Sequence, residues 1–121
     1  MNGTNKIVDF TTINEMLFGE VKYVKEFADA AIISFNEFKN NFAQYLKDRD
    51  EVNFRRMGHK IKPVAQMLGL TMILEEYEIG KALIEQEGSD LAISNSLQRI
   101  HTIIDQVLLE LHEVSVHGIP K

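Results

Sequence analysis

Residues 20–47, EVKYVKEFADAAIISFNEFKNNFAQYLK, carry the strongest structural pattern in the chain. Apolar side chains recur at alternating intervals of three and four residues, at Val21, Val24, Ala28, Ala31, Phe35, Phe38, Phe42 and Tyr45. This spacing places them on one face of an α-helix, which has about 3.6 residues per turn. The stretch therefore predicts one long amphipathic helix, roughly 40 Å in length at about 1.5 Å per residue.

Before this helix, the sequence predicts a disordered N-terminal segment followed by a short helix. Residues 1–9 contain Asn and Gly residues that discourage order, so we expect a disordered lead there. A short helix over about residues 11–18 should follow, capped by Thr11 or Thr12, with Glu15 at the capping-box spacing from Thr12.

Three more long helices are predicted after residue 47. Asp50 is a suitable N-cap for the first, and Gly69 suits the left-handed conformation just past its C-terminus. The second covers about residues 71–87. Gly88-Ser89-Asp90 supplies a stop and a new cap, and the last helix covers about residues 91–114.

These elements together predict an all-α fold. Strand-type alternation is absent, and four long amphipathic helices joined by short polar turns pack antiparallel with their neighbours. We expect an up-down-up-down four-helix bundle over residues 10–116, with the short extra helix at its N-terminus. Residues 117–121 should form a tail.

Composition restricts the classes of function. The 121 residues suit one domain, and a net charge of −5 argues against a nucleic-acid partner. There are no cysteines, which fits a reducing cytoplasm, and no stretch approaches the roughly 20 apolar residues of a membrane span. We therefore expect a monomeric cytoplasmic protein.

His59 is the most informative single residue. Phe54, Met57, Ile61, Val64 and Leu68 form one apolar stripe, and His59 falls about 180° from the middle of that stripe. It shares the water-facing side of the helix with four cationic or amide side chains, namely Arg55, Arg56, Lys62 and Gln66. An exposed imidazole among cations suits a nucleophile that carries a phosphoryl group, because positive charge holds phosphate oxygens and favours the neutral ring.

The segment around His59 resembles the signature of histidine-containing phosphotransfer (HPt) domains of two-component phosphorelays. The matching residues are His59, Lys62 three residues later, Gly69 ten residues later, and Gly58 just before the histidine. Pro63 departs from the glycine common at its position. Because proline lacks the amide that would bond to the His59 carbonyl, we expect a bend or widened turn at residues 59–63.

The resemblance implies a function and its partners. His59 would accept a phosphoryl group from the aspartate of a response-regulator receiver domain and pass it to another receiver, with a hybrid sensor kinase as a further partner. Lys62 would screen the phosphoryl oxygens, and Arg56, Gln66 and Arg55 would contact the phosphoryl group or the partner. The chain would be a phosphoryl carrier without ATP-dependent kinase activity, no cofactor is expected, and Mg²⁺ would be held by the receiver.

The partner surface should surround His59 and include apolar residues from the short N-terminal helix and from the start of the first long helix. Leu17, Phe18, Val21 or Phe27 could be partly exposed there and dock the receiver. Two other functions remain open: an adaptor that binds receivers without transferring phosphate, and a structural bundle that pairs with another helical protein.

The other titratable residues predict no second site. His101 lies near the apolar face of the last helix, where a partly buried structural histidine is expected, and the spacing of the four histidines does not match a di-iron bundle. Glu75, Glu76 and Glu78 are interpreted as a solvated helix face. No metal site and no phosphate-binding loop is predicted.

Overall fold

The apolar stripe of helix α2 (Val21–Lys47) is buried along most of its length, as the sequence predicts. Phe35 and Phe42 are fully enclosed at the centre of the core. Val21, in the first turn, exposes 58% of its surface, and Tyr45 near the other end of the helix is half-buried. The buried phenylalanine rings meet edge to face, and the Phe38 and Phe42 ring centroids are 5.7 Å apart. Such pairs add to the free energy gained by burial.

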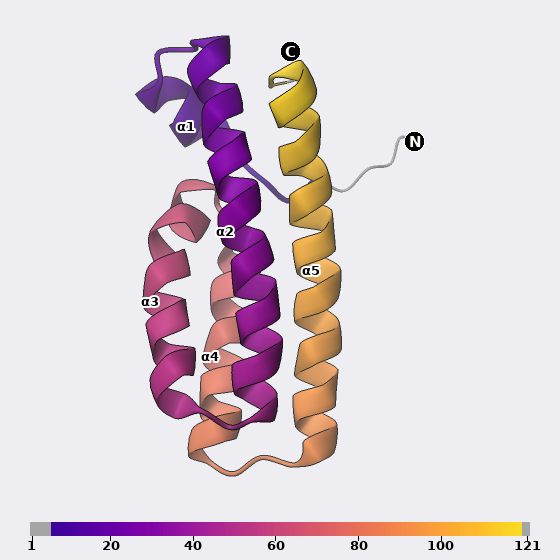
Figure 1. Cartoon of the computed structure of the whole chain (residues 1–121). Helices are drawn as coiled ribbons and strands as arrows, with labels where there is room; N and C mark the ends of the chain where they lie inside the picture. Colours follow the sequence, from indigo (N-terminus) through magenta and orange to yellow (C-terminus); the bar gives the residue numbers. More distant parts are fainter. Residues whose placement is uncertain (1–5, 120–121) are drawn as a thin grey trace.

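The computed structural model describes residues 6–119, which fold into an all-helical bundle (Figure 1). Helix α2 packs against α3 (Glu51–Met67) and α5 (Asp90–His117), and α4 (Thr71–Glu85) packs against the same two helices. The short helix α1 (Thr11–Met16) lies at the end of the bundle where α2 begins. No strand occurs in the described residues. The predicted all-α class is therefore confirmed.

Residues 6–119 contain no helix with both the length and the apolar character needed to cross a membrane.

Three of the predicted helix ends are confirmed in detail. The Asp50 carboxylate accepts the amide of Asn53 at 3.1 Å, which is an N-cap on α3. The Ser89 hydroxyl accepts the amide of Ala92 at 3.1 Å and caps α5 in the same way. Gly69 has a φ of 66°, the left-handed conformation expected just past the C-terminus of α3.

Helix α1 differs from the predicted helix at both ends. It stops at Met16 rather than Phe18, and no side chain caps its N-terminus, so the capping box predicted for Thr12 and Glu15 does not form. The Asp9 carboxylate instead accepts the amide of Thr11 at 2.9 Å. Aspartate favours such local bonds to the backbone two residues on, and here this bond competes with the predicted cap.

The last two helices also differ in extent from the predicted ranges. Helix α4 ends at Glu85, two residues before the predicted end, and α5 continues to His117, three residues beyond it. The predicted tail is therefore helical at its first residue. Ile119 then packs against the core, and residues 120–121 lie outside the described part of the chain.

Residues 6–9 are held in place, which differs from the disordered lead predicted for residues 1–9. The amides of Ile7 and Val8 each donate to the Glu110 carboxylate of α5 at 2.9 Å. The amide of Asp9 donates to the carbonyl of Leu68 at 2.9 Å. Buried backbone amides need such partners, and Glu110 supplies them from the interior. Residues 1–5 lie outside the described residues.

Glu76 is buried, so the interpretation of Glu75, Glu76 and Glu78 as one solvated face is wrong for its middle member. Glu76 exposes only 4% of its surface. Its carboxylate accepts a bond from Ser96 at 2.7 Å and two from Arg99 at 2.9 and 3.1 Å. These three bonds compensate the carboxylate for the loss of water and join α4 to α5.

Glu76→Ala should destabilise the bundle by about 2–3 kcal/mol, because it removes three charge-assisted bonds and leaves Ser96 without its partner. Glu75→Ala is the matched control, since Glu75 is exposed on the same helix and should change stability by less than about 0.5 kcal/mol. Urea unfolding followed by circular dichroism measures both. Equal stability of the two variants would contradict this role of Glu76.

Candidate functional site

His59 lies on the water-facing side of α3, where the sequence places it. Phe54, Met57 and Ile61 of the same helix are buried, whereas His59 is exposed. The burial of the apolar stripe fixes the rotation of α3 about its axis. That rotation keeps the imidazole in contact with solvent.

A groove with a volume of about 380 Å³ opens beside His59, between α3 and α4. It is lined from α3 by Arg55, Gly58, His59 and Lys62, and from α4 by Leu74, Tyr77, Glu78 and Lys81. We call this the His59 groove. Four of the seven residues predicted for the site, Arg55, Gly58, His59 and Lys62, thus share one concave surface.

Tyr77 forms the floor of the His59 groove because Gly58 has no side chain. A Cβ at Gly58 would lie 2.1 Å from Cζ of Tyr77, far inside contact distance. The Tyr77 ring stacks on Phe54, with centroids 5.2 Å apart and planes inclined by 10°. Its hydroxyl donates to the Arg55 carbonyl at 3.4 Å. Burial raises the pKa of Tyr77, so this hydroxyl stays protonated.

The cations of the groove differ in whether they already form an ion pair with a carboxylate. Arg55 bonds to Glu51 at 3.0 Å and also to Glu85. Lys81 pairs with Glu78 at 2.9 Å. Lys62 has no carboxylate within ion-pair distance among residues 6–119. Of the three cations that line the groove, Lys62 is therefore the one that no carboxylate of the described residues pairs with.

The remaining predicted residues lie outside the groove lining. Arg56 is exposed and makes only a 3.5 Å contact with Asn53. Gln66 is exposed near the end of α3, and Gly69 serves as its terminator. The chemistry of the groove therefore depends on fewer α3 residues than the sequence predicts.

Sequence reasoning missed the whole α4 side of the groove. Leu74, Tyr77, Glu78 and Lys81 line it, and none of them was predicted as a site residue. Their register against His59 depends on the packing of two helices, which no local motif encodes. Gly58 was the available signal, because a glycine within a helix often marks a close approach by a neighbouring side chain.

Pro63 does not widen the helix. Helix α3 is α-helical from Glu51 to Met67 with Pro63 inside it, so the widened turn predicted at residues 59–63 is wrong, while the alternative, a bend, stays a prediction. Pro63 is exposed, so water can hydrogen-bond to the His59 carbonyl, which lacks its partner amide in the helix.

The other three histidines do not line the His59 groove. His101 is exposed and lies 3.5 Å from Asp105 on the next turn, so the partly buried position predicted for it is wrong. His112 and His117 are also exposed. Within residues 6–119, no three His, Asp or Glu side chains are grouped so that they could hold a metal ion.

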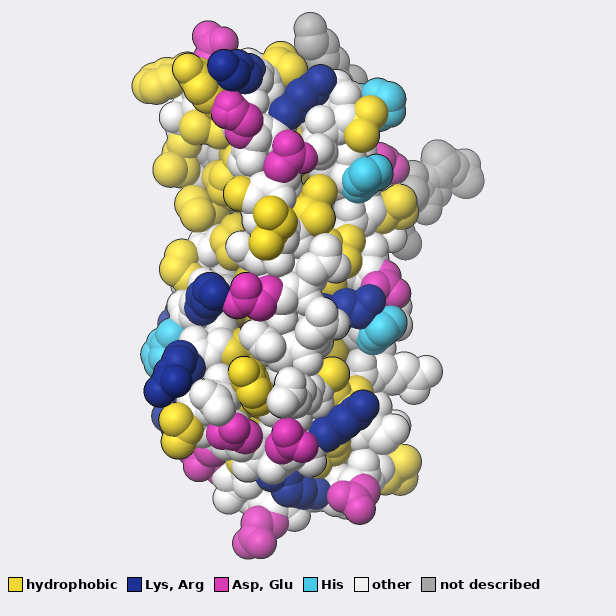
Figure 2. Space-filling model, in the orientation of Figure 1, with side chains coloured by type: hydrophobic (Ala, Val, Ile, Leu, Met, Phe, Trp, Pro, Cys, Tyr) yellow, Lys and Arg dark blue, Asp and Glu magenta, His cyan; other side chains and the backbone are white. Residues whose placement is uncertain are grey.

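An exposed apolar patch lies at the end of the bundle that carries α1. Figure 2 shows hydrophobic side chains gathered over α1 and the start of α2. Phe18 exposes 90% of its surface and Met16 exposes 57%. Val21 is also exposed, and Leu17 and Phe27 are half-buried, so the predicted exposure of these residues is confirmed. We call these five residues the N-terminal apolar patch.

The backbone at Phe18 ends helix α1. Phe18 has a φ of 56°, the left-handed conformation common just past a helix C-terminus. Arg49 and Glu87 have the same conformation just past α2 and α4, so the backbone at Phe18 is an ordinary helix end. What sets Phe18 apart is the exposure of its ring, because large apolar side chains exposed together are typical of an interaction surface.

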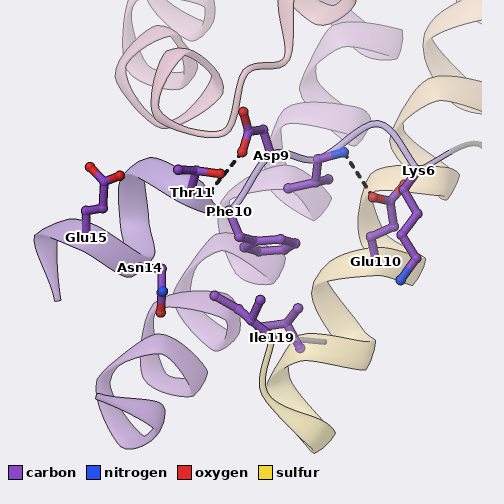
Figure 3. Close-up of a pocket in the computed structure, with 10 residues that line it drawn as sticks. Lys6, Asp9, Phe10, Thr11, Asn14, Glu15, Glu110 and Ile119 are labelled. Carbon is purple, nitrogen blue, oxygen red and sulfur yellow. Dashed lines mark hydrogen bonds between the residues drawn. The ribbon is translucent and has the colours of Figure 1, made fainter. Parts of the chain in front are cut away.

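A larger cavity than the His59 groove, with a volume of about 640 Å³, lies elsewhere, beside residues 6–9. Figure 3 shows Phe10 and Ile119 facing its interior, with Asp9 and Glu110 at its edge. The carboxylates of Asp9 and Glu110 already accept backbone amides of the adjoining segment. The two carboxylates at the edge of this cavity are therefore already used to hold the adjoining backbone in place.

Searches against protein-family models, curated proteins and solved structures found no match to this chain. Its function is therefore inferred from the chemistry of the His59 groove and from the resemblance at residues 58–69.

Gly58→Ala should destabilise the bundle by about 1–3 kcal/mol, because the new methyl group displaces the Tyr77 ring from the groove floor. The same substitution made in a Tyr77→Ala background should instead be neutral or stabilise by up to about 1 kcal/mol, since alanine favours a helix. A double-mutant cycle from urea unfolding measures the coupling. Equal effects in both backgrounds would show that Tyr77 does not constrain residue 58.

Proposed function

We propose that this chain is a histidine phosphotransfer protein of a two-component phosphorelay, with His59 as the phosphoryl acceptor. The observation that carries the proposal is the pairing of an exposed imidazole with an unoccupied cation, Lys62, in one groove. A phosphoryl group needs both a nucleophile and charge for its oxygens.

The proposed transfer proceeds from a receiver aspartyl phosphate to His59. The Nε2 lone pair attacks phosphorus in line, and the bond between phosphorus and the aspartate oxygen breaks. The electron pair of that bond remains on the released carboxylate, and Nδ1 then loses its proton to water. Transfer to a second receiver is the reverse reaction, in which a new aspartate attacks and Nε2 leaves.

Lys62 is proposed to bind the phosphoryl oxygens during this transfer. It lies one helical turn after His59 on the same side of α3, and its charge is not held by a carboxylate of the described chain. Arg55 is less suited to the role, because Glu51 and Glu85 already bind its guanidinium. Arg56 and Gln66 remain exposed and are proposed to contact the partner.

The N-terminal apolar patch is proposed as the docking surface for the receiver. It combines an exposed aromatic ring at Phe18 with the apolar residues around it, the composition found at the centre of protein interfaces. We propose that any Mg²⁺ used in transfer belongs to the receiver, whose aspartate carries the phosphate. The two proteins would then divide the chemistry between them.

His59→Gln should abolish phosphorylation of this chain by a receiver charged with acetyl phosphate. Glutamine keeps a polar side chain on the exposed face and removes the nucleophile, so helical content and melting temperature should stay nearly unchanged. Acid-labile, alkali-stable phosphate on the chain is the readout. Labelling of the variant would contradict the assignment of His59, and receiver binding by an unlabelled wild-type chain would identify an adaptor instead.

Lys62→Ala should slow transfer roughly ten- to a hundredfold, because a charge-assisted bond to phosphate is worth about 1.5–3 kcal/mol. Lys60→Ala is a matched control on the same helix, since Lys60 is turned toward α2 and pairs with Glu37 at 2.5 Å. Single-turnover transfer from the charged receiver measures both rates. Equal rates for the two variants would assign Lys62 to the solvated surface.

A further inference from the structure

We infer that Lys81 is a second phosphoryl-binding cation, which Glu78 holds while His59 is unphosphorylated and releases when the phosphoryl group arrives. This inference rests on the proposed function and adds a regulated element from α4 to the same site. It concerns the side of the His59 groove that the sequence signature does not reach.

The position of Lys81 places its ammonium group on the α4 wall of the groove. Lys81 lines the groove together with His59 and Lys62. Its Nζ lies 5.9 Å from the centroid of Tyr77, the ring that forms the groove floor beneath Gly58. A phosphoryl group on His59 would therefore have one cation from α3 and another from α4 on its two sides.

Glu78 determines whether the Lys81 ammonium group is available to a phosphoryl group. Its carboxylate holds the Lys81 ammonium at 2.9 Å, and this bond raises the pKa of Lys81 and keeps it charged. The pair is partly solvated, because the Glu78 side chain is 61% exposed, and such pairs are weak. A phosphoryl dianion carries about twice the charge of a carboxylate and three acceptor oxygens, so it can compete for the ammonium.

The charges of the groove support such an exchange. A carboxylate beside a phosphorylated histidine repels it unless a cation compensates, and Glu78 lines the groove as Lys81 does. Arg55 cannot readily take the place of Lys81, because it is bound to two carboxylates of its own. Glu78 and Lys81 should consequently affect the phosphorylated state in opposite directions.

The test uses the full chain phosphorylated at His59 with phosphoramidate, which donates without a receiver. The P–N bond of phosphoramidate breaks as Nε2 bonds to phosphorus, and ammonia leaves. ³¹P NMR then follows the titration of the phosphoryl group with pH. Lys81→Gln should raise the midpoint of this titration by about half a pH unit, and Glu78→Gln should lower it, because nearby cations favour the dianion and anions oppose it.

Two controls separate the groove from the overall charge of the chain. Glu75→Gln makes the same charge change on an exposed residue of α4 outside the groove lining, and Lys47→Gln does so at the end of α2. Neither should move the midpoint by a comparable amount. All four residues are replaced by a side chain of similar length, and circular dichroism verifies that each variant is folded.

The outcomes distinguish this inference from the proposed function. If phosphohistidine forms at His59 but the Lys81 and Glu78 variants shift the midpoint in the same direction or not at all, the inference is overturned and the acceptor role of His59 stands. If no phosphohistidine forms on the wild-type chain, both fail. Opposite shifts confined to these two variants would support Lys81 as a second phosphoryl-binding cation that Glu78 opposes.

Discussion

The close approach of α3 and α4 at Gly58 is the constraint on which the candidate site depends. Because residue 58 has no Cβ, the Tyr77 ring can lie against the α3 backbone and stack on Phe54. That contact closes the floor of the groove and sets α4 beside the turn that carries His59. A larger residue at position 58 would push the ring outward and fill the space that a phosphoryl group would need.

The distribution of ion pairs determines which cation of the groove could bind an anion. Most cations near His59 are occupied: Arg55 by two glutamates, Lys60 by Glu37, and Lys81 by Glu78. The net charge of −5 would otherwise disfavour an anionic ligand, so the uncompensated charge of Lys62 acts locally. The N-terminal apolar patch lies at the end of the bundle where α1 and α2 meet. A docked receiver would therefore have to contact both this patch and the surroundings of His59.

The helices and three of their ends could be predicted, because local patterns determine them. The three-and-four spacing of apolar residues defined α2, and Asp50, Ser89 and Gly69 marked helix ends through bonds or backbone angles of their own. The contacts that depend on two helices could not be predicted in this way. Glu76 resembles its exposed neighbours in sequence, and only the arrival of Ser96 and Arg99 from α5 makes its burial possible.

The same distinction applies to the candidate site. The α3 half was predictable, since His59 and Lys62 lie on one face of a helix whose opposite face is apolar. The α4 half, with Tyr77, Glu78 and Lys81, follows from tertiary packing. The segment at residues 6–9 was missed for a similar reason, because its order comes from Glu110, about a hundred residues away in sequence.

The central claim, that His59 accepts a phosphoryl group through Nε2, is tested most directly by locating the phosphate on the intact chain. Long-range ¹H–¹⁵N NMR of the ¹⁵N-labelled protein, recorded before and after phosphorylation by a charged receiver, resolves the ring nitrogens of all four histidines. We predict that only the His59 ring changes and that phosphorus is bonded to its Nε2. Phosphorylation at His101, His112 or His117, or an unchanged spectrum with a receiver that remains charged, would contradict it.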